Sequence, residues 1–406
     1  MTEIGASLSL TQTIVAPSFD DRSIDPHEWD DFVVGLEGDV YVSYDWCRIW
    51  WRHYGCGRTL RIFIFREAGQ LVGIAPMFIE RSALGPFGLR VGKRVGADHA
   101  LTLFALPLAS HVAERAYTEI LSTLIKTDRC DAVWIGVCPG NDPSLPGLRA
   151  AANRLHPVAA LARDAEVASH IVFDLPASFD AYLGTLDRRQ RQNYRRQMKQ
   201  FREQYRVGSD VIRAPPDRAL QLFDEFRAIH RRQWLTENKL GHFGDWPGAD
   251  SFNRELVETL SRSGRFRMIR LKSDDEIVSN QYAFVYGRRC FWRLPARSTR
   301  GEYDRFGLGV LGLVQLIEVM IDEGVHSIEA GLGHYDYKIR YGGKEMAARS
   351  CVVVANRWYS QLRYRVHLLI YRAIDVFYYK IWFRRVAVYL PFFQRPLWKA
   401  WIRSRL

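Results

Sequence analysis

Two stretches with the same order of apolar runs and turns occur 206 residues apart. Residues 61–79, RIFIFREAGQLVGIAPMFI, and residues 267–285, RMIRLKSDDEIVSNQYAFV, align without a gap. Two apolar runs on either side of a short turn predict a β-hairpin. Each hairpin is followed by a strand-like run, a helix-length segment and a short apolar strand. The repeated order predicts an α+β protein with two similar domains, each a mixed, mostly antiparallel sheet flanked by helices.

Breaker residues indicate where the domains end. Residues 139–157 are rich in Pro, Gly, Asn and Asp, and a boundary is expected after them. The length of 406 residues suits two domains. We expect an N-terminal extension over residues 1–24, a first domain over 25–165, a second domain over 166–356 and a helical tail over 357–406.

One segment of the second domain is strongly basic. Residues 187–206, DRRQRQNYRRQMKQFREQYR, hold eight Arg or Lys residues against two acids. Tyr194, Met198, Phe201 and Tyr205 follow one another at spacings of 4, 3 and 4, which places them on one stripe of a helix. We therefore predict a packed amphipathic helix whose charged sides meet solvent, a neighbouring domain or an anionic ligand.

The net charge of +12 is concentrated in the tail. Residues 357–406 hold eleven Arg or Lys residues and one acid, a charge of +10, so the first 356 residues carry only +2. A nearly neutral body gives no reason to expect DNA as a partner. The tail also holds fourteen aromatic residues. Two interpretations remain open: a helix on an anionic membrane surface, or a helix that wraps the domains and buries its aromatic side chains.

The cysteines and the N-terminus bear on the compartment. The six cysteines are scattered without a C-x-x-C pair or a histidine spacing typical of metal sites, so we expect a reduced chain and no metal. The first residues show no signal-peptide pattern, and charged residues interrupt every long apolar run. We expect a cytoplasmic protein, either soluble or peripheral at the inner face of the membrane.

A Gly-containing loop is the first candidate for chemistry. A strand is expected to end near Ala296, and Gly307 and Gly309 then open an apolar helix. Amide groups at a helix N-terminus bind anions such as a pyrophosphate, and glycine allows close approach. The alternative is that these glycines only turn the chain.

A second candidate follows the next strand. In SIEAGLGHYDYKIRYGGK, residues 327–344, the strand runs into His334, Asp336, Tyr337 and Lys338, which transfer protons or bind anions. A solvated charged loop is the alternative. Further upstream, a polar loop carries His242 and Trp246, with Trp234 nearby. That loop forms either part of an acceptor pocket or a packed surface.

The order of these motifs from Asp45 to Ala355 resembles the GNAT N-acetyltransferase superfamily. More narrowly, it is similar to the CelD-like or BioF-like acetyltransferases of bacterial cellulose biosynthesis, on the segments GLGHYDYKIRYG and DRRQRQNYRRQ. More distantly, it resembles the FemABX peptidyltransferases, which pair two such domains and use aminoacyl-tRNA. The resemblance implies that the first domain is degenerate, because no Gly loop precedes its helix HVAERAYTEI.

The resemblance implies acetyl-CoA or another acyl-CoA as co-substrate. The superfamily's loop is Q/R-x-x-G-x-G/A, whereas this chain has Arg305-Phe306-Gly307-Leu308-Gly309, one residue short, which leaves the donor open. The sheet is expected to splay between the strands that end at Ala296 and Ala330. The implied donor-binding residues are Leu294, Ala296, Arg305, Phe306, Gly307, Leu308, Gly309 and Val310.

The implied reaction is attack of an acceptor amine on the thioester carbonyl. His334 and Asp336 are the candidate bases, and Tyr337 or Lys338 is expected to stabilise the oxyanion or the leaving thiolate. The candidate substrate-binding residues are Arg188, Arg195, Trp234, His242, Arg340 and Tyr341, with Lys338 as a further candidate for an anionic acceptor.

The leading hypothesis is an acyl-CoA-dependent N-acyltransferase. Its acceptor would be an amine on a small molecule, a saccharide or a peptide, in exopolysaccharide or cell-envelope biosynthesis. One alternative is a FemABX-like transferase with aminoacyl-tRNA as donor, the only case in which tRNA is a partner. The other is a non-catalytic adaptor that binds a membrane surface through the tail.

Overall fold

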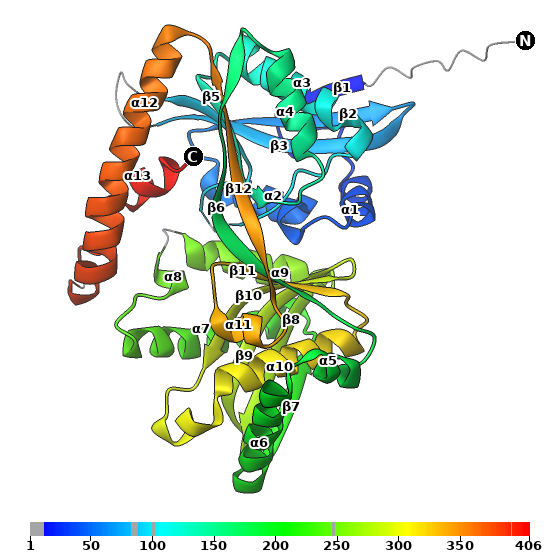
Figure 1. Ribbon diagram of the computed structural model, residues 1–406, viewed down its shortest axis with the longest axis vertical. Coiled ribbons are helices and arrows are strands. Elements are labelled where there is room, and N and C mark those ends of the chain that lie inside the picture. Colours follow the sequence, from blue (N-terminus) through cyan, green and yellow to red (C-terminus); the bar gives the residue numbers. More distant parts are fainter. Residues whose placement is uncertain (1–11, 83–87, 100–101, 246–247, 391) are drawn as a thin grey trace, which may run out of the picture. The chain divides into compact units, whose positions relative to one another are not determined.

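The computed structural model describes residues 12–82, 88–99, 102–245, 248–390 and 392–406 (Figure 1). The chain divides into two compact units. Unit 1 consists of the residues up to Ala165 together with Arg349–Tyr371 and Arg403–Leu406. Unit 2 consists of Glu166–Ala348 and Arg372–Ile402.

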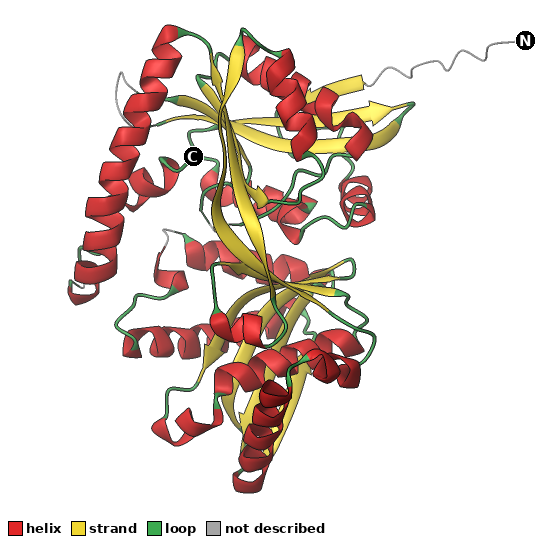
Figure 2. Ribbon diagram, viewed as in Figure 1, coloured by secondary structure: helices red, strands yellow, loops and turns green. Residues whose placement is uncertain are grey.

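Unit 1 has a mixed sheet with helices on both faces (Figure 2). Its strands follow the order β1-β2-β3-β4-β5-β12, antiparallel from β1 to β4 and parallel between β4 and β5. The apolar side chains of α3 and α4 pack against one face around Phe63, Phe65 and Met77. On the other face, the Trp50 ring of α2 lies 5.5 Å from the Phe78 ring. The elements are β1 (Gln12–Ala16), α1 (Pro26–Gly35), α2 (Tyr44–Tyr54), β2 (Thr59–Glu67), β3 (Gln70–Arg81), β4 (Arg90–Arg94), α3 (Ala113–Ser122), β5 (Ala132–Pro139), α4 (Leu145–Arg154) and the second half of β12 (Lys344–Ala355).

Unit 2 repeats this architecture. Its strands follow the order β6-β11-β10-β9-β8-β7, with a parallel pair between β10 and β11. Helix α10, apolar on most of its surface, packs with α5 and α6 against one face, and the aromatic side chains of α7 contact Tyr282 on the other. The elements are β6 (Ala159–Asp174), α5 (Phe179–Thr185), α6 (Arg188–Gln204), β7 (Val207–Ile212), α7 (Pro216–Thr236), α8 (His242–Asp245), α9 (Ala249–Arg262), β8 (Phe266–Ser273), β9 (Glu276–Tyr286), β10 (Arg289–Arg297), α10 (Leu308–Asp322), β11 (Ser327–Leu332) and α11 (Asp336–Arg340).

The two predicted hairpins are confirmed. Strands β2 and β3 pair antiparallel around Ala68 and Gly69, and β8 and β9 pair antiparallel around Asp274 and Asp275. These four turn residues have positive φ angles, between 46° and 82°, which Gly and Asp tolerate better than most residues. The mixed, mostly antiparallel sheets with flanking helices are the fold class expected from the repeat.

Strands β6 and β12 run from one unit into the other. The unit boundaries fall after Ala165, within β6, and after Ala348, within β12. Unit 1 is therefore not one continuous stretch, whereas the sequence analysis treated residues 25–165 and 166–356 as separate domains. Strand β1 also belongs to the sheet, although it lies in the stretch 1–24 that was set apart as an extension.

The basic helix α6 has the expected amphipathic packing. Tyr194 and Phe201 are buried in the core of unit 2, and Met198 and Tyr205 pack against that core. Asp187 caps the helix by accepting a hydrogen bond from the Gln190 amide at 2.8 Å. The Arg side chains occupy the remaining circumference.

The tail is helical. It begins with α12 (Trp358–Ala373), continues as a π-helical segment (Ile374–Val386) and ends in the short helix α13 (Trp398–Arg403). Among the described residues, no helix is long and apolar enough to cross a membrane.

Candidate functional site

Strands β10 and β11 diverge at their carboxyl ends. The parallel ladder between them comprises Arg289–Ser327, Cys290–Ile328 and Phe291–Glu329, and then stops. Strand β10 nevertheless continues in its antiparallel pairing with β9 as far as Arg297, after an irregularity at Trp292 and Leu294. Beyond Phe291, β10 no longer pairs with β11; there the Pro295 carbonyl oxygen accepts a hydrogen bond from His230, and the Arg297 amide donates one to Gln233. We call this divergence the β10–β11 fork.

The N-terminus of α10 opens onto a cavity beside the fork. Gly307 precedes the helix with a φ of 62°, and no side chain caps this end of the helix. Amide groups at the start of a helix are suited to hold an anion, although that of Val310 already donates to the Gly307 carbonyl oxygen at 2.8 Å. The cavity has a volume of about 470 Å³, and we call it the fork cavity. It is lined by Gln233, Ser279, Gln281, Pro295, Ala296, Arg297, Tyr303, Asp304, Gly307, Leu308, Gly309, Val310 and Tyr337.

The structure separates the expected donor-binding residues into two sets. Ala296 and the four residues Gly307–Val310 line the fork cavity. Phe306 instead packs its ring in the core, 5.1 Å from the ring of Phe201. Arg305 is exposed with its guanidinium over the Phe306 ring, and Leu294 pairs with Tyr282 on β9. Neither Arg305 nor Leu294 is among the residues that line the cavity.

Lys338 lies inside the fork. The segment after β11, which the sequence suggested as a loop, forms the short helix α11 and directs this side chain inward. Its Nζ atom donates a hydrogen bond of 2.7 Å to the carbonyl oxygen of Ala330 on β11. The same atom lies 4.6 Å from the Trp292 ring of β10 and 4.4 Å from the Tyr335 ring. Burial lowers the pKa of Lys338 to about 8, against the opposing effect of Glu329.

Tyr337 and Tyr341 have different surroundings. Tyr337 lines the fork cavity, and burial raises the pKa of its phenol well above the ordinary value of 10. Tyr341 is buried against α5 and α6: its carbonyl oxygen accepts a hydrogen bond from the Tyr182 hydroxyl, and its own hydroxyl accepts one from Asn193. Tyr341 therefore anchors the segment after α11.

His334 and Asp336 form an exposed cluster with Glu345. Nδ1 of His334 lies 3.0 Å from the Glu345 carboxylate, and Nε2 lies 3.0 Å from Asp336. Both hydrogen bonds raise the pKa of His334, so the imidazolium form is favoured. A histidine with both nitrogens directed at carboxylates is a poor proton acceptor. Arg340, also exposed, donates to the carbonyl oxygen of Asp336.

A pair of histidines lies behind the end of β10. Nδ1 of His230 lies 3.2 Å from the carbonyl oxygen of Pro295, and its Nε2 lies 3.2 Å from Nδ1 of His242. Because a carbonyl can only accept, Nδ1 of His230 carries the proton, and Nε2 accepts from His242. Burial lowers the pKa of His230 to about 4 and that of His242 to about 3. Trp234 completes the cluster with its ring 4.7 Å from His242, while Trp246 lies outside the described residues.

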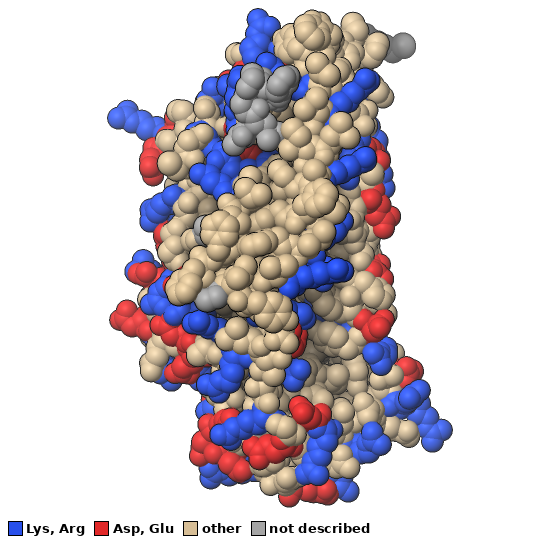
Figure 3. Space-filling model, turned by 90° about the vertical axis from the view of Figure 1, so that its left-hand side faces the viewer, with Lys and Arg blue, Asp and Glu red and all other residues tan. Residues whose placement is uncertain are grey.

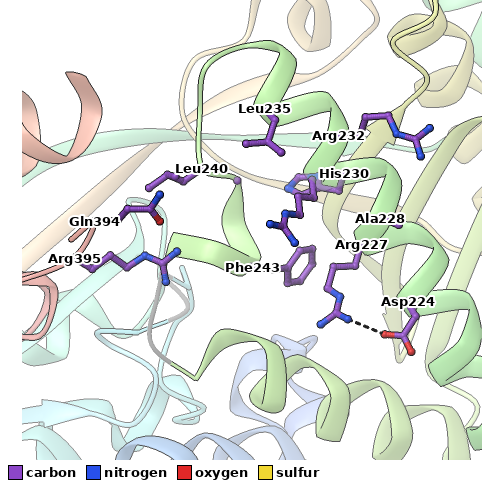
Figure 4. A pocket seen from close by; sticks show the side chains of 12 residues that line it. Asp224, Arg227, Ala228, His230, Arg232, Leu235, Leu240, Phe243, Gln394 and Arg395 are labelled. Atoms are coloured by element: carbon purple, nitrogen blue, oxygen red, sulfur yellow. Dashed lines mark ion pairs between the residues drawn. The ribbon is translucent and has the colours of Figure 1, made fainter. Parts of the chain in front are cut away.

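His230 also lines a second cavity, of about 700 Å³, beside α7 and α8 (Figure 4). Figure 4 shows Arg227 directed at Asp224, with which it forms an ion pair of 3.3 Å. Sequence reasoning selected His242 and missed His230. The available signal was its position on the apolar stripe of α7, four residues after the buried Phe226.

The two arginines proposed from α6 lie away from the fork cavity. Arg188 is exposed at the first position of the helix, and neither it nor Arg195 lines that cavity. Arg195 instead lines a separate cavity of about 560 Å³, together with Lys199, Arg202 and Glu318. The structure thus brings together Ala296, the Gly307–Val310 segment and Tyr337, but not the α6 arginines.

Unit 1 has a corresponding fork that is filled by a side chain. Strands β4 and β5 pair in parallel only as far as Lys93–Trp134. The guanidinium of the fully buried Arg94 donates to the carbonyl oxygen of Val137 on β5 at 2.8 Å and to that of Phe104. A side chain thus satisfies the backbone groups that a ligand would meet.

Comparison with known proteins agrees with this geometry. Residues 188–339, which include α6, the fork and Lys338, match the family model of the acetyltransferase (GNAT) domain. This match places residues 188–339 of unit 2 in the GNAT superfamily. The whole chain has the fold of FemX, with a TM-score of 0.61 and 13% identity over 84% of this chain and 98% of that chain. At this identity the likeness shows the fold alone.

Two further structures align with most of this chain. One is L-PGS from Bacillus licheniformis, with a TM-score of 0.49 and 12% identity over 87% of this chain and 97% of that chain. The other is a tandem GNAT protein from the clavulanic acid biosynthesis pathway, with a TM-score of 0.40 and 11% identity over 85% of this chain and 99% of that chain. No curated protein sequence matches the chain. No group of three or more metal-ligating side chains occurs in the described part of the GNAT domain or of unit 1.

Proposed function

We propose that the protein is an N-acyltransferase that takes its acyl group from acetyl-CoA or another acyl-CoA. One observation carries the proposal: the fork cavity joins diverging parallel strands to a helix N-terminus that no side chain caps. The gap where β11 diverges from β10 can admit a pantetheine chain, and the N-terminus of α10 can hold the pyrophosphate. The acyl group then reaches the fork near Lys338.

Lys338 is suited to act on the leaving group. The acceptor amine attacks the thioester carbonyl, the carbon–sulfur bond breaks and the sulfur leaves as a thiolate. The pKa of Lys338, about 8, lies close to the value of about 8.5 for a thiol, so the ammonium can donate its proton to the thiolate without a large energetic penalty. Tyr337 lines the cavity, and we assign its hydroxyl to donate to the developing oxyanion.

The proton that the attacking amine loses must be accepted by a group other than Lys338. His334 is disfavoured by its raised pKa, whereas Asp336 is exposed and ionisable, and we assign it to accept the proton through water. The acceptor is an amine on a small molecule, saccharide or peptide. The proposed setting, the cytoplasmic side of exopolysaccharide or cell-envelope biosynthesis, rests on the similarity of the motifs GLGHYDYKIRYG and DRRQRQNYRRQ to CelD-like proteins.

The test measures acyl-CoA binding by calorimetry and thiol release with a panel of amines. A Gly309→Leu variant places a side chain at the cavity, where a Cβ atom meets nothing within 4 Å, so the fold should tolerate it. Gly184→Leu on α5 is the matched control, because a Cβ there also meets nothing within 4 Å. We expect binding by the native protein and by G184L, and its loss in G309L. If the native protein fails to bind acyl-CoA, or if G309L binds normally, the proposal is wrong.

One residue favours a second donor. Asp304 lines the fork cavity three residues before Gly307, where the superfamily's loop has Gln or Arg. A carboxylate opposes a pyrophosphate, and Arg297 on the opposite strand compensates only part of this effect. An aminoacyl-tRNA presents an ester without a pyrophosphate near the reacting group. Transfer from charged tRNA, with binding that weakens steeply as salt rises, would support this donor over acyl-CoA.

A further inference from the structure

The part of the tail that belongs to unit 2, residues 372–402, exposes large apolar side chains. Nineteen large hydrophobic residues of the described chain are exposed, and eight of them lie in these 31 residues, so the exposure is concentrated rather than scattered. Phe392 is 98% exposed, Tyr389 72% and Phe377 70%. The other five are Val376, Ile381, Leu390, Phe393 and Leu397. We call these eight residues the tail apolar surface.

The tail apolar surface is not a poorly packed helix. Other side chains of the same segment are buried: Tyr378, Trp398 and Trp401 are each only 3% exposed. The rings of Tyr379 and Trp401 stack at 4.1 Å, and Trp401 donates to the Asp375 carboxylate at 3.1 Å. The segment therefore packs some of its aromatic side chains within the protein and exposes other aromatic and aliphatic groups. The burial of these aromatic side chains agrees with a tail that packs on the protein, whereas the membrane interpretation stays a prediction.

Cations surround the exposed side. Residues 372–402 hold six Arg or Lys residues, namely Arg372, Lys380, Arg384, Arg385, Arg395 and Lys399. The single acid, Asp375, is engaged by Lys380 at 2.9 Å. Figure 3, which turns the left-hand side of Figure 1 to the viewer, shows uncharged side chains bordered by Lys and Arg on this face. Aromatic groups with flanking cations match the interface of an anionic bilayer, where rings enter the headgroup region and cations meet phosphates.

We propose that the tail apolar surface docks the protein on the surface of a membrane that contains anionic lipids. A second copy of this chain is a less suitable occupant, because two such faces would bring six cations against six. Docking requires no transmembrane segment, since exposed aromatic and aliphatic side chains need only enter the interfacial region of the bilayer. The proposal is independent of the acyl donor, and catalysis can be intact in a variant that no longer docks.

The experiment is flotation of the full-length protein with vesicles. Vesicles of phosphatidylcholine with phosphatidylserine should carry the protein upward, vesicles of phosphatidylcholine alone should carry much less, and added salt should release it. R384Q/R385Q should weaken partitioning roughly 30-fold, since each cation near an anionic surface contributes a factor of about five. F392S/F393S should weaken it roughly tenfold or more.

Matched controls separate docking from general charge or misfolding. R188Q/R189Q removes two neighbouring exposed arginines at the start of α6, and V211S removes an exposed apolar side chain on β7. Both should float like the native protein, and all four variants should keep the native urea midpoint. If the native protein does not float with anionic vesicles, the proposal is overturned. It is also overturned if R188Q/R189Q loses as much vesicle binding as R384Q/R385Q. It is also overturned if F392S/F393S changes only the oligomeric state in size-exclusion chromatography.

Discussion

His230 makes the stability of unit 2 depend on pH in the acid range. The side chain is 1% exposed, and both ring nitrogens are engaged, with Pro295 and His242. Burial lowers its pKa from 6.5 to about 4, so the folded protein prefers the neutral ring. The unfolded chain takes up a proton near pH 6.5, before the folded protein does. The contribution is therefore fully present above that pH and is lost as the pH falls towards about 4.

The magnitude follows from the two pKa values. The difference between 6.5 and about 4 corresponds to about 3 kcal/mol when the pH lies below both values. At about pH 5, the histidine of the unfolded chain is almost fully protonated and that of the folded protein is not. The free energy of unfolding is then about 2 kcal/mol lower than at about pH 7.5.

The assay is urea denaturation followed by tryptophan fluorescence at about pH 7.5 and about pH 5. His230→Gln keeps an amide that can donate to the Pro295 carbonyl oxygen, but it cannot titrate. Between the two pH values, the free energy of unfolding of the native protein should fall by about 2 kcal/mol more than that of H230Q. His27→Gln, at an exposed position of α1, is the control and should lose as much as the native protein. The reasoning is refuted if H230Q and the native protein lose stability equally, or if the His230 ring titrates near pH 6.5 by NMR.

Three further predictions concern the fork. In Gly312→Ala, the added Cβ overlaps the Ser279 hydroxyl and the Gln281 amide, so we expect a loss of about 1–3 kcal/mol in urea denaturation, with G184A as the unaffected control. Asp304→Asn removes the carboxylate at the fork cavity and should tighten acyl-CoA binding severalfold in calorimetry, whereas unchanged or weaker binding would argue against a pyrophosphate at that position. The rate of acyl transfer should fall above about pH 8 as Lys338 loses its proton. In K338R this decline should shift to higher pH, because arginine keeps its proton. An identical pH profile for the two proteins would exclude the Lys338 ammonium as the proton donor.

The sequence was sufficient for the architecture of each unit because the signals are local. The two hairpins follow from apolar runs around turn residues, and the burial of α6 follows from the 4, 3, 4 spacing that begins at Tyr194. The glycine segment at the start of α10 was also accessible, since its positive φ at Gly307 requires a residue without a side chain.

Features that depend on distant contacts were not accessible. The inward direction of Lys338 depends on a carbonyl group on β11 and a ring on β10, which no sequence spacing encodes. The burial of His230 could be inferred from the apolar stripe of α7, but its hydrogen bond to the carbonyl oxygen of Pro295, 65 residues later, could not. The division of β12 between the units has no local signal either, because its apolar run at Cys351–Ala355 would fit a strand of either sheet.

The passage of β12 into unit 1 has a consequence for biosynthesis. Unit 1 needs residues 349–355 to complete its sheet, yet the ribosome makes all of residues 166–348 first. The N-terminal part must therefore wait, incomplete, with the edge of β5 unpaired, until the second part has left the exit tunnel. For the same reason, a gene cut after codon 165 would yield neither half as an intact folding unit. A circular permutant that places residues 349–371 ahead of the N-terminus would let unit 1 mature first.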